Sequence, residues 1–163
     1  MAVLELGLAP EGFHPRFSAQ SRVYRYTILC QPWRSPLERR TAWHVTRKPD
    51  VERMAEASRF LVGTHDFATF GRPPQGENTV RTVFRADWQV SEFRFLFEIE
   101  ANAFLYRMVR NIVGTLVQVG WEQLSPRDFE AMIQARDRSL VKQVAPAHGL
   151  CLMRVDYAAR EGV

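Results

Sequence analysis

The stretch ANAFLYRMVRNIVGTL, residues 101–116, constrains the fold more than any other part of the chain. Wound as a helix at about 100° per residue, it gathers one broad apolar stripe, made of Leu105, Met108, Val109, Ile112 and Leu116. Such a stripe must be buried against other elements. The opposite side is narrow and carries Arg107, Arg110, Asn111 and Gly114. Polar stripes on surface helices are ordinary, so a solvated face and a binding face both remain open at this point.

Several other stretches alternate with period two, as strands do. In RVYRYTILC, residues 22–30, the side chains of Tyr24 and Tyr26 face one way and that of Arg25 the other. After the turn QPWRSP, the stretch ERRTAWHVT predicts the partner strand of a hairpin. TVRTVFRADWQV and EFRFLFEIEA predict a second hairpin, and GLCLMRVDY predicts a closing strand. VLELGLA, residues 3–9, predicts a strand that enters from something earlier in a longer protein.

Two further helices have recognisable ends. DVERMAEASRFLVG has Asp50 as a candidate N-cap and is expected to stop at Gly63. SPRDFEAMIQAR begins with Ser125, and Asp128 three residues later completes a capping box. Between them, GRPPQGENT has the composition of a mobile loop. Paired strands with associated helices predict an α+β fold, in which an antiparallel sheet carries helices on one face.

The charge balance mildly favours a polyanionic partner such as nucleic acid. Lys and Arg number 22 against 18 Asp and Glu, which gives a net charge of +4 and an isoelectric point near 9.5. Arginines on the strands would lie on the sheet face that has no helices. We therefore expect that face to offer a platform for single-stranded or flipped-out bases.

No self-contained catalytic motif is present. The sequence lacks a Walker loop, a nucleophile elbow and an HExxH pair, and Cys30 and Cys151 stand alone without a matched His. The four histidines are scattered, so no metal is expected. No apolar run approaches the roughly 20 residues that span a bilayer, which predicts a soluble, cytoplasmic protein.

Asp66, in THDFATF, is the only carboxylate flanked by His and aromatic residues. Aspartate in such a place usually bonds nearby backbone amides as a turn or cap residue, and this interpretation is favoured. The rival hypothesis makes Asp66 a catalytic nucleophile. For the two strand tyrosines, an ordinary place in the core and a place under a nucleobase both stay open.

Five motifs together carry a family resemblance. FHPRFSAQSRVYRY, GTHDFATF, TVRTV, ANAFLYRMVRNIVGTL and APAHGLCLMRVDY occur in the order and spacing of the TruA-type tRNA pseudouridine synthases. The chain resembles the C-terminal half of that family, which implies a pseudouridine synthase fold. Residues 13–163 would form the C-terminal lobe, and residues 1–12 would be a strand and linker from a missing N-terminal half. The family's nucleophilic aspartate belongs to a stretch reading Arg-Thr-Asp-Ala-Gly-Val-His, which is absent here.

The resemblance also implies roles for single residues. Tyr24 would pack against the target base, and Arg110 would pair with the nucleophilic aspartate of the other half. Gly114, one turn further on, would let that half come close. Arg22, Arg25 and Arg81 become candidates for tRNA contacts. The family often has His at the position of Arg107, so only a phosphate contact is expected there.

The family needs no cofactor and no metal, because the isomerisation is redox-neutral and the nucleophile comes from protein. It works as a homodimer that holds tRNA across both subunits and reaches uridines in the anticodon stem-loop. The resemblance thus implies a lobe that completes an active site and is inactive alone. Two alternatives remain: a stand-alone RNA-binding module, and a truncated product without an independent role, whose apolar surface along residues 3–9 would be exposed.

Overall fold

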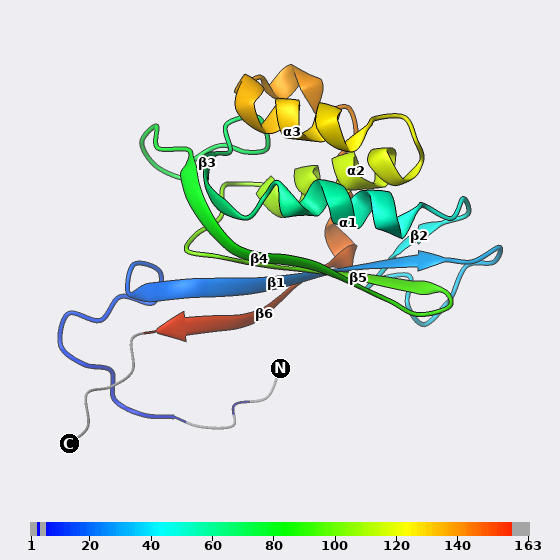
Figure 1. The fold of residues 1–163 in the computed structure, drawn as a ribbon. Helices are drawn as coiled ribbons and strands as arrows, with labels where there is room; N and C mark the ends of the chain where they lie inside the picture. The colour runs from blue at the N-terminus through cyan, green and yellow to red at the C-terminus, as the bar shows by residue number, and fades with distance from the viewer. Residues whose placement is uncertain (1–2, 4–5, 158–163) are drawn as a thin grey trace.

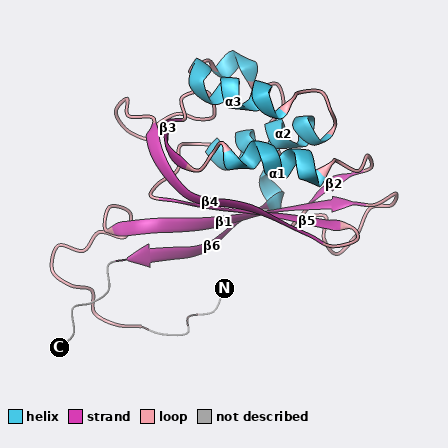
Figure 2. Ribbon diagram, viewed as in Figure 1, coloured by secondary structure: helices cyan, strands magenta, loops and turns pink. Residues whose placement is uncertain are grey.

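The computed structural model describes residues 3 and 6–157, which form one mixed sheet covered by α-helices on one face (Figures 1 and 2). The strands are β1 (Ala19–Cys30), β2 (Trp43–Val45), β3 (Gly63–Asp66), β4 (Val80–Val90), β5 (Arg94–Ala101) and β6 (Leu150–Tyr157). The α-helices are α1 (Val51–Arg59), α2 (Met108–Gly120) and α3 (Pro126–Ala135). Two short 3-10 helices, η1 (Arg138–Leu140) and η2 (Ala147–Gly149), precede β6. The predicted α+β class is confirmed.

The sheet runs in the order β2-β1-β5-β4-β3, and β6 also pairs with β1. β4 and β5 form the predicted antiparallel hairpin. The hairpin expected between β1 and β2 is wrong, because β2 runs parallel to β1 with Ile28 opposite Trp43. A hairpin needs a short turn. Here the longer segment 31–42, which contains two prolines, connects the two strands. It returns the chain to a position beside Ile28, so β2 runs in the same direction as β1. The sheet is therefore mixed, not purely antiparallel.

The caps of α1 and α3 follow the sequence. The Asp50 carboxylate accepts from the backbone N–H groups of Glu52 and Arg53 at 2.9 and 3.2 Å. Ser125 and Asp128 form the predicted capping box at the start of α3. These side chains satisfy N–H groups that have no partner inside the helix. α1 ends at Arg59, before Gly63, and Gly63 instead begins the short strand β3, which the sequence did not reveal.

The organising helix begins later than predicted. Residues 101–107 are not helical: Ala101 ends β5, and Arg107 has a left-handed backbone with φ of 63° directly before α2. Leu105 lies in this connection and is buried all the same. Its side chain packs against Gly71, where an added Cβ would lie 2.5 Å from the Cβ of Leu105. Hydrophobic periodicity placed Leu105 in the helix, because a buried apolar residue has the same signature in a connecting segment as in a helical turn.

The core lies between the sheet and α2. Phe95, Phe97 and Ile99 of β5 are fully buried, as are Met108 and Ile112 of α2. On the side of α2 that looked polar, Asn111 and Gly114 are buried by other segments of the chain, whereas Arg110 is half-buried and Arg107, just before the helix, is exposed. There the Asn111 side-chain amide donates to the carbonyl oxygen of Phe70 at 2.6 Å. A buried amide needs such a partner, so this residue holds the β3–β4 loop rather than facing solvent.

The described residues before β1 do not form a strand. Leu6 and Leu8 are more than nine-tenths exposed, and Val3 is also exposed. The rest of the predicted strand at residues 3–9 lies outside the described residues. Within the described part of the chain, no helix is long and apolar enough to span a membrane.

Candidate active site

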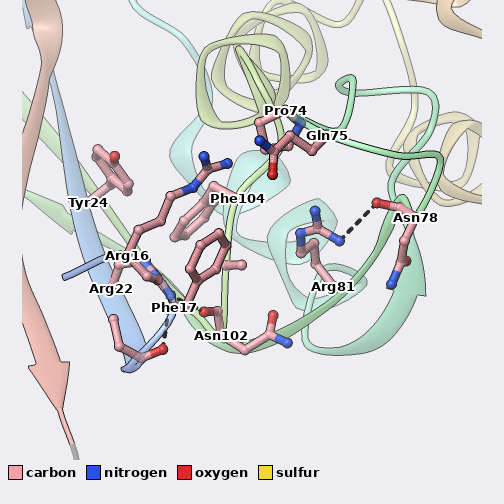
Figure 3. A pocket seen from close by; sticks show the side chains of 12 residues that line it. Arg16, Phe17, Arg22, Tyr24, Pro74, Gln75, Asn78, Arg81, Asn102 and Phe104 are labelled. Carbon is pink, nitrogen blue, oxygen red and sulfur yellow. Dashed lines mark hydrogen bonds between the residues drawn. The ribbon is translucent and has the colours of Figure 1, made fainter. Parts of the chain in front are cut away.

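A cavity of about 560 Å³ opens beside β1 (Figure 3). The turn before β1, β1 itself, the loop before β4, the start of β4 and the segment between β5 and α2 all contribute to it. Its lining residues are Arg16, Phe17, Ala19, Arg22, Tyr24, Pro74, Gln75, Asn78, Arg81, Asn102, Ala103 and Phe104. None of them is Asp or Glu. The cavity therefore combines aromatic rings, amides and cations, a set suited to an anionic ligand with flat rings.

The two tyrosines of β1 have different surroundings. Tyr26 is fully buried, and its hydroxyl donates to the carbonyl oxygen of Pro146 at 2.6 Å. Burial raises the pKa of this phenol well above its usual range, and the nearby Arg110 charge partly offsets that rise. Tyr24 is only half-buried and lines the cavity, where its ring meets that of Phe104 edge to face with centroids 5.0 Å apart. Only Tyr24 is placed to meet a ligand ring.

The guanidinium of Arg22 forms hydrogen bonds with backbone carbonyl oxygens. It donates to the carbonyl oxygens of Ala19 at 3.2 Å and Asn102 at 2.5 Å, and also to that of Arg16. These bonds tie the turn before β1 to the segment after β5. Arg22 lines the cavity and also shapes its wall.

Arg81 lies on the opposite wall (Figure 3). Its guanidinium donates to the carbonyl oxygens of Asn78 at 3.1 Å and Val80 at 2.6 Å. The Nε atom is buried without a partner, and burial lowers the pKa of the guanidinium. A desolvated cation of this kind gains more from an anionic ligand than a fully solvated one does.

Arg107 lies in an adjoining cavity of about 280 Å³ that shares Arg16, Tyr24 and Phe104 with the first. The left-handed backbone at Arg107 sets its guanidinium over the ring of Tyr106, 5.2 Å from the ring centroid. The two cavities also share Pro74, and they adjoin at Tyr24. Three of the predicted arginines, Arg22, Arg81 and Arg107, are thus brought together with the predicted tyrosine.

Arg110, on the first turn of α2, is held by the segment that precedes β6. Its Nε donates to the carbonyl oxygen of Ala145 at 2.7 Å, and the Ala145 N–H donates back to the Arg110 carbonyl oxygen at 3.1 Å. Among the described residues, no carboxylate lies within the 4.0 Å of an ion pair with Arg110. This cation is oriented without being neutralised.

Gly114 has a different role from the one expected. A Cβ added there would lie 2.2 Å from the carbonyl oxygen of Gln143. The close approach that Gly114 permits is therefore made by the 143–145 segment of this chain, so the space beside it is already filled. Gly114 holds the segment whose Ala145 carbonyl orients Arg110.

Arg25 points to the other face of the sheet. It forms a salt bridge with Glu98 at 2.6 Å, and Arg85 approaches the same carboxylate at 3.3 Å. The hydrogen bond from Arg25 lowers the pKa of Glu98, with smaller help from Arg85. The cavity around Tyr24 lies on the helix side of the sheet, not on the helix-free face that the sequence favoured. The reason is that strand alternation turns Tyr24 toward the same side as the buried Tyr26.

Asp66 behaves as the turn residue that the sequence favoured. Its Oδ1 accepts from the Ala68 N–H at 3.0 Å and from the Thr79 hydroxyl at 2.5 Å, and its Oδ2 meets Arg136 at 3.0 Å. Oδ1 thus holds the β3–β4 connection, and Oδ2 ties it to Arg136 at the end of α3. Within the described residues, no group of three or more His, Cys, Asp or Glu side chains could hold a metal ion.

Sequence reasoning missed Arg16, Phe17 and Phe104 as site residues. The ring of His14 accepts hydrogen bonds from the backbone N–H groups of Arg16 and Phe17 at 3.2 and 3.4 Å, which shapes the turn that presents both side chains. Phe17 is 69% exposed, unusual for its size, and Arg16 lies over its ring. An arginine between aromatic residues in a loop was the available signal.

Comparison with known proteins identifies the family. Residues 57–158 match the family model described as tRNA pseudouridine synthase. The tRNA pseudouridine synthase A of Syntrophotalea carbinolica is 42% identical over 164 residues, covering 100% of this chain and 65% of that protein. The protein of the same name from Bacillus velezensis is 40% identical over 158 residues, covering 96% of this chain and 64% of that protein. That from Bacillus licheniformis is 44% identical over 146 residues, covering 89% and 59%.

The chain therefore spans less than two thirds of the length of these relatives, and it matches their C-terminal portion. The family model alone covers more than half of the chain, and it includes α2 and the 145–157 segment that holds Arg110. The chain belongs to the tRNA pseudouridine synthase family.

Proposed function

We propose that this chain forms the C-terminal lobe of a cytoplasmic tRNA pseudouridine synthase that converts uridine to pseudouridine in the anticodon stem-loop. One observation carries the proposal: a cavity lined by Tyr24 and cationic side chains, without a carboxylate of its own. Such a site is equipped to bind a nucleotide. It lacks a group that could attack one.

Tyr24 would serve as the platform for the target base. Taking a base out of a stacked stem costs a few kcal/mol, and stacking on an aromatic ring recovers about 1–3 kcal/mol. The edge-to-face contact with Phe104 fixes the ring in one orientation before RNA arrives. This preorganisation supports Tyr24, rather than the buried Tyr26, as the residue that meets uridine.

The nucleophilic aspartate would come from outside the 163 residues. Its attack allows the bond between N1 of uracil and C1′ of ribose to break, and the base then rejoins ribose through C5. The proton on C5 leaves to solvent and N1 gains one, so no oxidant, reductant or cofactor is consumed. Arg110, oriented by Ala145 and without an ion-pair partner among the described residues, would hold that aspartate ionised and in position.

The remaining predicted arginines would contact the tRNA backbone. Arg81 lines the larger cavity beside Tyr24, and Arg107 lines the adjoining one. Arg22 lines the larger cavity and also fixes its wall. Such contacts hold the RNA in register and make binding salt-dependent. RNA contact by Arg25 remains a prediction, and it would compete with Glu98 for the same guanidinium.

The aspartate-bearing half would dock along β6. Among the described residues, β6 pairs with β1 on one edge only, and its Leu152 and Met153 are nearly half exposed. An open strand edge with apolar side chains is a ready template for another chain segment. In the proposed assembly, two such complete units form a homodimer that holds one tRNA across both subunits.

Tritium release from tRNA labelled at C5 of uridine tests this proposal. The chain is assayed alone and then with an aspartate-bearing N-terminal half. We expect release only after the addition. Release by the chain alone would place the nucleophile within these residues, and Asp66→Asn would then be the first variant to examine. No release in either assay would overturn the proposal.

A stand-alone RNA-binding module is the second candidate, and the same carboxylate-free cavity favours it. It predicts salt-sensitive tRNA binding by the chain alone and no tritium release when the aspartate-bearing half is added. The third candidate, a truncated product without a role, fits the exposure of Leu6 and Leu8. A cooperative thermal unfolding transition without aggregation would exclude it.

A further inference from the structure

A second basic pocket lies at the other end of β1. It has a volume of about 300 Å³ and lies where β2 joins β1, and we call it the β2 pocket. Its lining residues are Leu29, Arg34, Ser35, Glu38, Arg39, Ala42, Trp43, His44 and His148. It shares no residue with the two cavities around Tyr24. Leu29 lies five residue steps beyond Tyr24 along the extended strand β1, which is about 17 Å.

The charge in the β2 pocket is not balanced from within. Among the described residues that line it, Glu38 is the only one with a carboxylate, and the Arg94 guanidinium already forms a salt bridge with that group. Within the described part of the chain, neither Arg34 nor Arg39 has a carboxylate within 4.0 Å. Residues 34–48 carry five Lys or Arg side chains against this single acid. The pocket thus lies within a strongly cationic stretch.

The pocket has a defined shape. The Ser35 hydroxyl accepts from the Glu38 N–H at 3.3 Å, and the Glu38 carbonyl oxygen accepts from the Ala42 N–H at 3.0 Å. His44 Nε2 lies 2.8 Å from the carbonyl oxygen of Gln31 and must donate to it, because a carbonyl only accepts. These bonds fold the 31–42 segment back onto β2. Leu29 and Ala42 are buried and form an apolar floor under the cations.

We infer that the β2 pocket binds the phosphodiester backbone of RNA, at a second contact remote from the cavity around Tyr24. Arg34 and Arg39 supply planar guanidinium groups that match phosphate oxygens in pairs. His148, from the short helix η2, also lines the pocket. The volume suits one phosphate with its ribose. The inference relies on the proposed function only for the identity of the RNA as tRNA.

The test is tRNA binding by the chain at a series of salt concentrations, followed by fluorescence anisotropy. The variant Arg34→Ala/Arg39→Ala removes both guanidinium groups of the pocket. We expect the slope of log affinity against log salt to become about two smaller, and affinity at low salt to fall roughly tenfold. Arg34→Lys/Arg39→Lys keeps the charge and should retain most of the slope.

The matched control, Arg59→Ala/Arg127→Ala, removes the same charge from exposed positions on α1 and α3. It should leave the slope nearly unchanged. Equal slopes for the pocket variant and the control would overturn the inference, and an acidic protein would then be the occupant to examine. Failure of the unchanged chain to bind tRNA at the lowest salt concentration would overturn it as well.

The same assay separates this inference from the proposed function. Tyr24→Ala probes the cavity around Tyr24, and no isomerisation is needed for the readout. If the pocket variant weakens binding and tritium release is never seen, the second contact stands and the proposed chemistry fails. If Tyr24→Ala weakens binding and the pocket variant does not, the second contact fails, and RNA binding by the cavity around Tyr24 stands.

Discussion

Arginines on the two faces of the sheet have different hydrogen-bonding partners. On the helix side, Arg22 and Arg81 border a cavity whose described lining residues include no carboxylate, and their guanidinium groups donate to backbone carbonyls. On the helix-free side, Arg25 meets Glu98. An arginine whose partners are carbonyls keeps its net charge for a ligand, whereas one paired with a carboxylate does not. The number of arginines on a strand therefore says little about where RNA binds. The distribution of carboxylates says more.

The helix-free face extends this pattern along the neighbouring strands. Arg85 lies between Asp87 and Glu98, and Arg154 contacts Asp156 and approaches Glu100. Arg25, Arg85 and Arg154 each have a carboxylate oxygen within 4.0 Å. This face stabilises the sheet through cross-strand charge pairs, while the cavity on the helix side leaves its positive charge for a partner.

The largest expected effect belongs to Arg110. Replacing it by Ala in the chain joined to an aspartate-bearing half should lower isomerisation turnover by about 100- to 1,000-fold, since the nucleophile loses its positioning cation. The tRNA affinity should change less than about twofold. Tritium release and anisotropy measure the two quantities separately. Equal losses in both would contradict the assigned role, and an unchanged unfolding midpoint would show that the Ala145 contact was not needed for the fold.

The tyrosine pair gives the next largest effect. Tyr24→Ala should lower isomerisation about 10- to 100-fold, because a stacking ring is worth about 1–3 kcal/mol, while Tyr24→Phe should retain most activity. Tyr26→Phe is the matched control within the same strand. It loses the hydrogen bond to the Pro146 carbonyl oxygen, which should cost about 1 kcal/mol of unfolding free energy and leave RNA binding intact. A loss of isomerisation in Tyr26→Phe as large as that in Tyr24→Ala would contradict the distinction drawn between the two tyrosines.

The sequence predicted the local elements well and the spatial arrangement in part. The helix caps at Asp50 and Ser125 rest on contacts within one turn, so local pattern was sufficient. The parallel pairing of β2 and the role of Gly114 depend on segments far away in sequence, which no local pattern encodes. The same holds for Arg22, whose hydrogen bond to the carbonyl oxygen of Asn102 joins segments that are far apart in the sequence.

The family resemblance named more of the residues that line the cavities than hydrophobic periodicity did. It named Tyr24, Arg22, Arg81 and Arg107, which line the two adjoining cavities, but also Arg25, which pairs with Glu98 on the other face of the sheet. Composition and strand alternation pointed instead to the helix-free face, because they count arginines without their partners. On that face Glu98 of β5 pairs with Arg25 of β1, and this contact between distant segments could not be predicted from local sequence.

A smaller effect is expected from Glu98 itself. Its folded-state pKa is depressed, chiefly by the hydrogen bond from Arg25, so its contribution to stability is present above the unfolded value of about 4.3 and is lost as pH falls through the folded value. Glu98→Gln should lower the unfolding free energy by about 1 kcal/mol at neutral pH. The difference from the unchanged chain should disappear in acid. Denaturant unfolding at several pH values measures this, and a difference independent of pH would contradict it.

The smallest effect should come from Arg25, and it tests the comparison most directly. Arg25→Ala frees Glu98 but removes no cation from the cavity around Tyr24, so tRNA affinity should change by less than about twofold and the salt slope by less than about one. Arg81→Ala, on the other side of the sheet, should lower the slope by about one. If both variants lowered the slope equally, Arg25 would contact RNA in spite of its ion pair. The helix-free face would then belong to the binding surface, and the partners of an arginine in the free protein would not predict its partners in the complex.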